Sequence, residues 1–233
     1  SKSTHYHKPS EPLPSGQEIR KMTDKSLQQS LSALQTSYID IYMLHNGNMQ
    51  TLTHPEITDL FTDYKKRGVI RATGASVYTV EEAMVAIESG IWDVIQVGYN
   101  LMDQRMGTVF SLARQHGVGV VIRSALLKGI LTDRGRELHP ELTAVQQHRD
   151  SYSELFSEAA PTLSELAMKF VLSQPDVSSV VVGIDKMDYL QTALNVADGV
   201  YLDERALTRA NELVYPDPDF LDLPKWDTLG WLN

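Results

Sequence analysis

Polar side chains recur at the ends of short apolar runs in this sequence. His45 ends the run YIDIYMLH, Ser76 ends IRATGAS, Gln96 lies within DVIQVGYN, and Ser124 ends VVIRS. A histidine at the carboxyl end of a buried strand can act as a general acid or polarise a carbonyl, and it can equally cap the strand through a backbone hydrogen bond. Together these donors predict a mouth able to hydrogen-bond an amide and a phosphate, as a nicotinamide dinucleotide requires.

The elements that must position these side chains alternate between strand and helix. Strands are expected at Tyr38–His45, Val69–Ser76, Asp93–Tyr99, Val118–Ser124 and Ser178–Gly183. Helices are expected at Asp24–Gln35, Pro55–Lys66, Val80–Ser89, Gly107–His116, Pro161–Ser173 and Glu204–Leu213. Apolar runs that are continuous rather than alternating are typical of parallel strands covered by helices.

Two α/β architectures fit this alternation, a closed (β/α)8 TIM barrel and a doubly wound open sheet. The glycine-rich GxGxxG turn of a doubly wound nucleotide-binding sheet is absent, which favours the barrel. A single domain over residues 1–233 is expected, because no Gly-, Pro- or Ser-rich linker interrupts the chain. The polar stretch Thr132–Ala159 predicts a loop with an accessory helix over one end of the barrel.

The number of strands falls short of a closed barrel, which needs eight. The sequence predicts five, with the end of a sixth at Ser1-Lys2. Open parallel edges are an aggregation liability. We therefore expect either that the sequence lacks about two N-terminal βα units of the barrel, or that another chain covers the edges.

Composition excludes several kinds of chemistry. The 233 residues include no cysteine, which rules out disulfides, zinc–thiolate sites, iron–sulfur clusters and cysteine nucleophiles, and permits a cytoplasmic location. The net charge of -9 argues against nucleic-acid or anionic-membrane partners. No apolar run approaches the roughly 20 residues that span a bilayer. His5 and His7 have strand-like spacing, but no carboxylate cluster accompanies them, so no metal site is expected.

Five segments resemble the aldo-keto reductase family, in the order and spacing of that family's strands four to eight. They read SLQQSLSALQTSYIDIYMLHN, GVIRATGAS, DVIQVGYNLMDQ, GVGVVIRSALLKGIL and VSSVVVGIDKMDYLQTALN. The resemblance implies a barrel that binds NADP or NAD and passes a hydride to an aldehyde or ketone, or oxidises the corresponding alcohol or sugar. The expected partner is thus a small carbonyl or sugar substrate, and a homo-oligomer is compatible with it.

The same resemblance implies which residues form the catalytic group. The family uses a tyrosine acid with a lysine, an aspartate and a histidine. The histidine corresponds to His45, where the imidazole would orient and polarise the carbonyl, and the lysine corresponds to Lys2. A cation beside the tyrosine would lower the pKa of the phenol. The family's aspartate and tyrosine precede that lysine, so neither is expected among these residues.

Cofactor contacts are also implied by the resemblance, with departures. Ser76 and Gln96 match residues that bind the nicotinamide carboxamide, whereas Val77 replaces a usual asparagine. The loop that wraps the nicotinamide and pyrophosphate corresponds to Arg123, Ser124, Leu126 and Lys128, with Ala125 in place of a proline. Gly183 ends the last strand, Asp185 occupies the position where a serine often meets the 2′-phosphate, and Thr192 and Ala193 replace a Glu-Asn pair that binds adenine.

These departures leave three functions open. A carboxylate at Asp185 repels a phosphate but can accept hydrogen bonds from a ribose hydroxyl. This predicts either a preference for NADH or weak dinucleotide binding, although Lys186 could still receive a phosphate. The alternatives to a reductase are a catalytically weak, reductase-like regulatory or binding protein, and an inactive truncated form.

Overall fold

The computed structural model describes residues 1–6 and 12–232. The chain divides into two compact units. Unit 1 comprises Ser1–Val97 with Thr108–Val121, and unit 2 comprises Gly98–Gly107 with Ile122–Asn233. The described strands are hydrogen-bonded in the sequential order β1-β2-β3-β4-β5. Their bounds are Ile39–Leu44 (β1), Ile70–Ser76 (β2), Val94–Gly98 (β3), Gly119–Arg123 (β4) and Ser179–Val180 (β5). All five lie within strands that the sequence predicts, and β5 is the most shortened.

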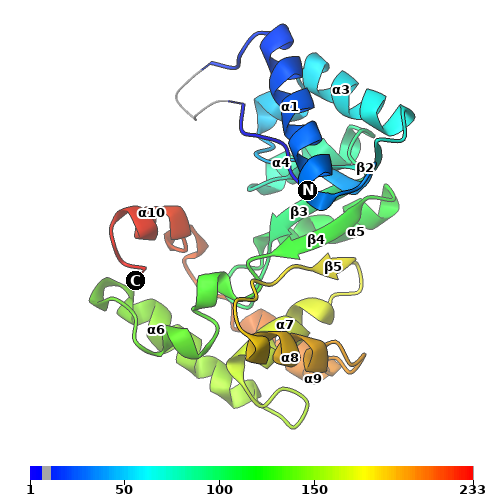
Figure 1. Cartoon of the computed structure of the whole chain (residues 1–233). Helices are drawn as coiled ribbons and strands as arrows, with labels where there is room; N and C mark the ends of the chain where they lie inside the picture. The colour runs from blue at the N-terminus through cyan, green and yellow to red at the C-terminus, as the bar shows by residue number, and fades with distance from the viewer. Residues whose placement is uncertain (7–11, 233) are drawn as a thin grey trace. The chain divides into compact units, whose positions relative to one another are not determined.

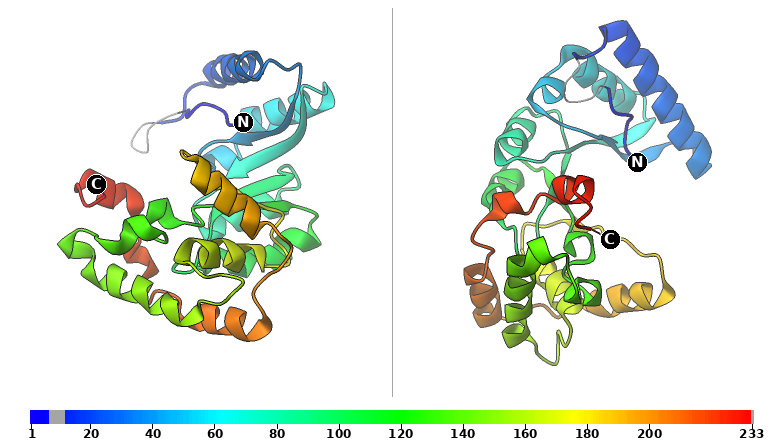
Figure 2. Two further views of the ribbon diagram at one scale, coloured as in Figure 1. Left: turned by 60° about the horizontal axis from the view of Figure 1, so that its bottom comes forward. Right: turned by 90° about the vertical axis from the view of Figure 1, so that its left-hand side faces the viewer.

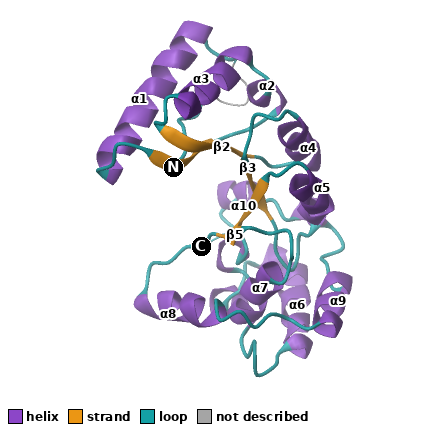
Figure 3. Ribbon diagram, turned by 90° about the vertical axis from the view of Figure 1, so that its right-hand side faces the viewer, coloured by secondary structure: helices purple, strands orange, loops and turns teal. Residues whose placement is uncertain are grey.

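Unit 1 is built from parallel strands and the helices that cover them. The helices are α1 (Gly16–Leu34), α2 (Met49–Leu52), α3 (Pro55–Lys66), α4 (Val80–Glu88) and α5 (Phe110–Gln115), the last preceded by the 3-10 turn η1 (Arg105–Val109). Strand β2 pairs in parallel with both β1 and β3. Helix α3 packs on β2 and against α1, and α4 packs against α5 (Figures 1 and 3).

The chain start adds a further parallel pairing to β1. The Met43 N–H donates to the Ser1 carbonyl at 2.9 Å, and the Ser3 N–H donates to the Met43 carbonyl at 2.7 Å. This confirms the strand end predicted at Ser1-Lys2, and it brings Lys2 beside the end of β1.

The two faces of the unit 1 sheet pack differently. Between sheet and helices, Phe61 stacks on Tyr42 with ring centroids 5.5 Å apart and meets Trp92 edge-on at 5.1 Å. The opposite face carries a small apolar cluster that includes Met43 and Val94. Gly74 belongs to this face, and a Cβ there would lie only 2.6 Å from Met43 Cγ. The close approach of the Met43 side chain therefore requires a glycine.

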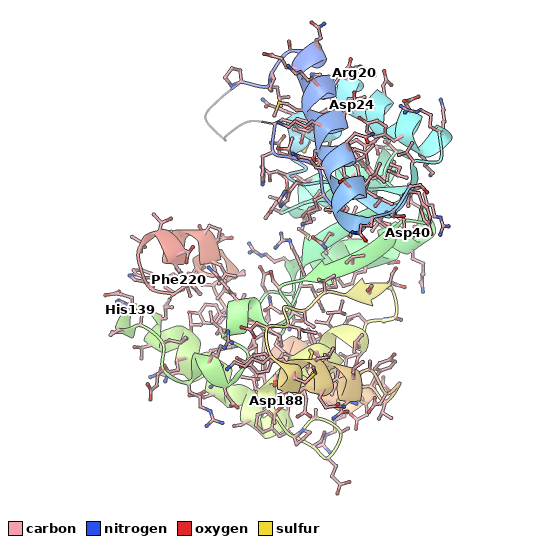
Figure 4. All side chains as sticks on the ribbon, in the orientation of Figure 1. Arg20, Asp24, Asp40, His139, Asp188 and Phe220 are labelled. Carbon is pink, nitrogen blue, oxygen red and sulfur yellow. The ribbon has the colours of Figure 1, made fainter. Side chains whose placement is uncertain are left out.

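Helix α1 begins eight residues earlier than the sequence analysis predicts, at Gly16 rather than Asp24. Ser15 caps it: the Glu18 N–H donates to the Ser15 hydroxyl, and the Glu18 carboxylate accepts from the Ser15 N–H at 3.1 Å. This reciprocal pair satisfies backbone donors that a helix start otherwise leaves without partners. Asp24 instead accepts a 2.7 Å hydrogen bond from the Tyr64 hydroxyl. Figure 4 labels Arg20 and Asp24 one turn apart on α1.

Unit 2 is mostly helical. Its α-helices are α6 (Thr143–Ser151), α7 (Leu163–Leu172), α8 (Met187–Val196), α9 (Glu204–Glu212) and α10 (Leu223–Thr228). Its 3-10 turns are η2 (Leu127–Gly129), η3 (Asp133–Arg136), η4 (Pro140–Leu142), η5 (Tyr152–Leu155) and η6 (Pro218–Phe220). Helix α6 confirms the accessory helix predicted within Thr132–Ala159, whereas α8 and α10 had not been predicted as helices.

Helix α7 anchors the carboxyl end of α8. Lys169 on α7 is buried, and its ammonium donates to both carboxylate oxygens of Asp198 at 3.0 Å and to the Val200 carbonyl at 2.5 Å. These bonds hold the segment that follows α8. Figure 2 shows α8 as the gold helix. Among the described residues, no helix combines the length and the apolar character that crossing a membrane requires.

Candidate functional site

Strand register brings three of the predicted site residues of unit 1 to one end of the sheet. Ser76 of β2 pairs with Gln96 of β3, and His45 directly follows Leu44, which pairs with Ala75. The Lys2 ammonium donates to the Ser76 hydroxyl at 3.3 Å. Since parallel strands present their carboxyl ends at the same edge, Lys2, His45, Ser76 and Gln96 form one polar cluster, which we call the strand-end cluster.

His45 is held by the chain start rather than by its own loop. Its backbone N–H donates to the Ser3 hydroxyl at 3.3 Å, and its ring lies against that of His5 with centroids 4.1 Å apart. Burial lowers the pKa of His45 below its ordinary value of 6.5, and the charges of His5 and Lys2 lower that pKa further. The imidazole is therefore neutral near pH 7, so one ring nitrogen can donate and the other can accept a hydrogen bond.

His5 is a member of this environment that the sequence analysis missed. In the sequence, the spacing of His5 relates it only to His7, which lies outside the described residues. No sequence signal points from His5 to His45, because the two are 40 positions apart and meet only through pairing of Ser1–Ser3 with β1. Within the described part of the chain, no group of three metal-ligating side chains occurs.

The turn beside Ser76 is closely packed. The Gly47 N–H donates to the Ser76 carbonyl at 2.9 Å, and a Cβ on Gly47 would lie 3.2 Å from that oxygen. Val77 is fully buried, and its N–H donates to the Gln96 carbonyl at 3.0 Å. The Val77 side chain is thus part of the hydrophobic core, and it supplies none of the polar contacts that an asparagine side chain would.

Unit 2 contains a cavity of about 780 Å³, within the size range of cofactor and ligand sites. Five of the predicted cofactor residues line it: Ser124, Leu126, Lys128, Gly183 and Asp185. Ala125, Thr192 and Ala193, the positions that depart from the family pattern, line it as well. Arg123 does not, since its guanidinium lies beside Gly98, 3.3 Å from where a Cβ would be. A Cβ on Gly183 would meet no atom within 4 Å, so this wall of the cavity is open.

The loop after β4 forms one wall of the cavity in an unusual backbone conformation. Ser124, Leu127 and Lys128 have φ values of 59°, 45° and 53°, in the left-handed region that side-chain-bearing residues seldom adopt. Each such residue costs roughly 1–2 kcal/mol, and such strain persists only where surrounding contacts impose it. A loop held this way presents its backbone in one arrangement to a bound ligand.

Hydrogen bonds from Arg149 and the close packing of Gly135 hold this loop. The buried Arg149 of α6 donates to the Ile130 carbonyl at 2.9 Å and to the Thr132 carbonyl at 2.8 Å. Gly135 packs so closely on Ile130 that a Cβ would lie 2.0 Å from its carbonyl oxygen. The residues from Ser124 to Gly135 therefore form a braced wall.

Opposite charges meet at the edge of the cavity. Asp185 accepts from the Arg134 guanidinium at 3.2 Å, and Lys128 pairs with Asp227 at 3.1 Å. Arg134 also lies over the Tyr189 ring, 5.4 Å from its centroid. Arg134 and Tyr189 line the cavity and were not predicted, because no spacing rule joins Arg134 to a carboxylate 51 residues later. Figure 4 labels a further lining residue, Asp188, on α8.

Comparison with known proteins identifies a family match along most of the chain. The Aldo/keto reductase family model matches residues 9–214. An uncharacterised oxidoreductase of Bacillus subtilis, YqkF, is 29% identical over 192 residues, covering 78% of this chain and 62% of that protein. The NADH-specific methylglyoxal reductase of Escherichia coli is 27% identical over 201 residues, covering 76% of this chain and 62% of that protein.

Solved structures show the same fold. The holo form of the aldo-keto reductase AKR11C1 from Bacillus halodurans superposes with a TM-score of 0.73 at 24% identity, covering 91% of this chain and 71% of that one. The chain spans less than two thirds of the length of the curated relatives that it matches.

Proposed function

Because the chain belongs to the aldo/keto reductase family, we propose that it serves NAD(P)H-dependent reduction of small aldehydes or ketones, or oxidation of the corresponding alcohols or sugars. The observation that carries this proposal is the strand-end cluster, where the Lys2 ammonium lies 3.3 Å from the Ser76 hydroxyl beside His45. The family match runs through both units, which supports a single domain over residues 1–233.

Each unit, taken by itself, presents residues that fit one part of a nicotinamide dinucleotide. In unit 2, the braced loop offers Ser124, Leu126 and Lys128 to a pyrophosphate, and the cavity of about 780 Å³ suits an adenosine-sized group between that loop and Gly183. In unit 1, Ser76 and Gln96 would hold a carboxamide. When bound, the nicotinamide would supply or accept the hydride.

The side chains of unit 1 would orient the carbonyl and stabilise charge on it. A neutral His45 can donate a hydrogen bond to the carbonyl oxygen, which polarises the bond that is reduced. Lys2 holds a positive charge at the same edge, where it would stabilise negative charge developing on that oxygen and lower the pKa of a neighbouring acid. His5 packs against His45 and would limit the motion of its ring.

A preference for NADH over NADPH forms part of the proposal. Asp185 places a carboxylate at the cavity edge, and one relative carries the name NADH-specific methylglyoxal reductase. Quenching of tryptophan fluorescence by each dinucleotide tests the preference, since Trp226 and Trp231 belong to unit 2. Tighter binding of NADPH than of NADH would refute it.

Turnover is tested with a broad panel of aldehydes and ketones. His45→Gln should lower kcat by about 100-fold or more and leave the dinucleotide Kd unchanged. His116→Gln is the matched control, because His116 is an exposed histidine of unit 1 outside the cluster. Dinucleotide binding without turnover would favour the second candidate function, a reductase-like binding protein, which the apolar Val77 also favours. Failure to bind either dinucleotide would refute both functions.

A further inference from the structure

The ion pair between Arg134 and Asp185 joins two segments that lie far apart in sequence, at the edge of the unit 2 cavity. Arg134 comes from η3, after the braced loop, and Asp185 comes from the segment between β5 and α8. Their nitrogen and oxygen atoms are 3.2 Å apart. Asp185 therefore presents to the cavity not an isolated carboxylate but one already paired with a cation.

Contacts at both ends of Arg134 position it at the cavity edge. At the backbone, the Arg134 main-chain N–H donates to the Thr132 hydroxyl at 3.2 Å, and that hydroxyl donates to the Gly129 carbonyl at 2.6 Å. The next residue, Gly135, packs on the Ile130 carbonyl. At the other end of the side chain, the guanidinium carbon lies 5.4 Å from the Tyr189 ring centroid, a cation–π distance.

The pairing changes what the cavity edge can recognise. Asp185, paired with Arg134, keeps lone pairs that can accept hydrogen bonds from a ribose hydroxyl. A phosphate on that ribose would be repelled by Asp185 and would have to displace it from Arg134. Without the carboxylate, Arg134 becomes a free guanidinium, the side chain best suited to bind a phosphate through two hydrogen bonds. Lys186, whose ammonium lies 5.6 Å from the same Tyr189 ring, adds a second positive charge.

We propose that Arg134 and Asp185 together set the discrimination between a 2′-hydroxyl and a 2′-phosphate on the adenosine ribose. Asp185 selects the free hydroxyl and occupies Arg134, which is a latent phosphate-binding residue. This proposal rests on the proposed function, because it assigns the unit 2 cavity to the adenosine side of a dinucleotide.

Calorimetric titration of the full chain with ADP-ribose and with its 2′-phosphorylated form tests the proposal, since neither ligand requires nicotinamide or turnover. The wild type should bind ADP-ribose more tightly. Asp185→Ser should weaken the binding of ADP-ribose. The same substitution should tighten the binding of the 2′-phosphorylated ligand by about tenfold, which corresponds to one charge-assisted hydrogen bond. Adding Arg134→Gln to Asp185→Ser should abolish that gain.

Arg136→Gln is the matched control. Arg136 lies in the same 3-10 turn but pairs with Asp133 at 2.7 Å and has a side chain 71% exposed, so its removal should leave both affinities unchanged. The inference fails if Asp185→Ser changes the affinities for both ligands equally. It also fails if the tighter binding of the 2′-phosphorylated ligand persists when Arg134 is replaced. If ADP-ribose does not bind even the wild type, the proposed function fails instead, and the inference with it.

Discussion

The bracing of the cavity wall by Arg149 leads to a prediction for unit 2. The side chain of Arg149 is only 7% exposed and connects α6 to two carbonyls of the loop after β4, while its third nitrogen contacts the Asp150 carboxylate. Arg149→Met keeps a long flexible side chain and removes every side-chain hydrogen-bond donor. The substitution therefore separates the hydrogen bonds of Arg149 from its packing.

The loss of stability expected for Arg149→Met follows from the two carbonyls that lose their donor. Ile130 is buried, so its carbonyl would lose its partner without gaining water, whereas the half-buried Thr132 would recover some hydration. Each loss of this kind costs about 1–3 kcal/mol, and removal of a buried charge offsets part of the sum. We expect unfolding free energy to fall by about 2–4 kcal/mol. Dinucleotide affinity should fall as well, because the left-handed residues Ser124, Leu127 and Lys128 lose the contacts that impose their conformation.

Urea unfolding curves, hydrogen exchange of the loop amides and dinucleotide titration check this expectation. Arg149→Lys should be intermediate, because a single ammonium cannot reproduce the fork of the guanidinium. The exposed Arg136→Gln should behave as the wild type. A change in unfolding free energy below about 0.5 kcal/mol for Arg149→Met, with unchanged loop exchange and affinity, would refute the reasoning, since that is the ordinary size of a surface substitution.

Two further predictions concern unit 1. Gly74→Ala should lower the free energy of unfolding by about 1–3 kcal/mol, because its Cβ would lie 2.6 Å from Met43 Cγ. Gly183→Ala is the control and should be close to neutral in urea unfolding, because a Cβ there would meet no atom within 4 Å. Equal effects of the two substitutions would contradict the packing argument. The His45 ring should titrate below 6.5 by NMR, with its resonance assigned through His45→Gln. Because its folded-state pKa is lowered, the unfolded chain takes up the proton first, so stability should fall as pH drops from 6.5 towards the folded-state pKa. A titration midpoint of the His45 ring at or above pH 6.5 would contradict the lowered pKa.

Local patterns in the sequence predicted the element order well, because they depend on neighbouring residues. Apolar runs covered on both faces mark all five strands, and the sequence places Ser76 at the end of β2. The early start of α1 could also have been predicted, since Ser15 and Glu18 have the spacing of a capping box. Helix α8 is a different case, because the sequence analysis predicts only a cofactor-binding stretch there and no helix.

Contacts between distant segments could not be predicted in the same way. Lys2 reaches Ser76 across 74 positions, and His5 meets His45, only because Ser1–Ser3 pairs with β1. In the sequence Asp185 is a carboxylate with no evident partner, but the fold supplies Arg134 from a separate loop.

By itself, the sequence determined the order of strands and helices, the family resemblance and the residue types at the strand ends, because each depends on local spacing. Only the tertiary structure decided the partners of those residues: the imidazole beside His45, the cation paired with Asp185 and the arginine that braces the loop. Charge and burial at a site depend on groups brought together through space, and no local pattern encodes which distant side chain will arrive there.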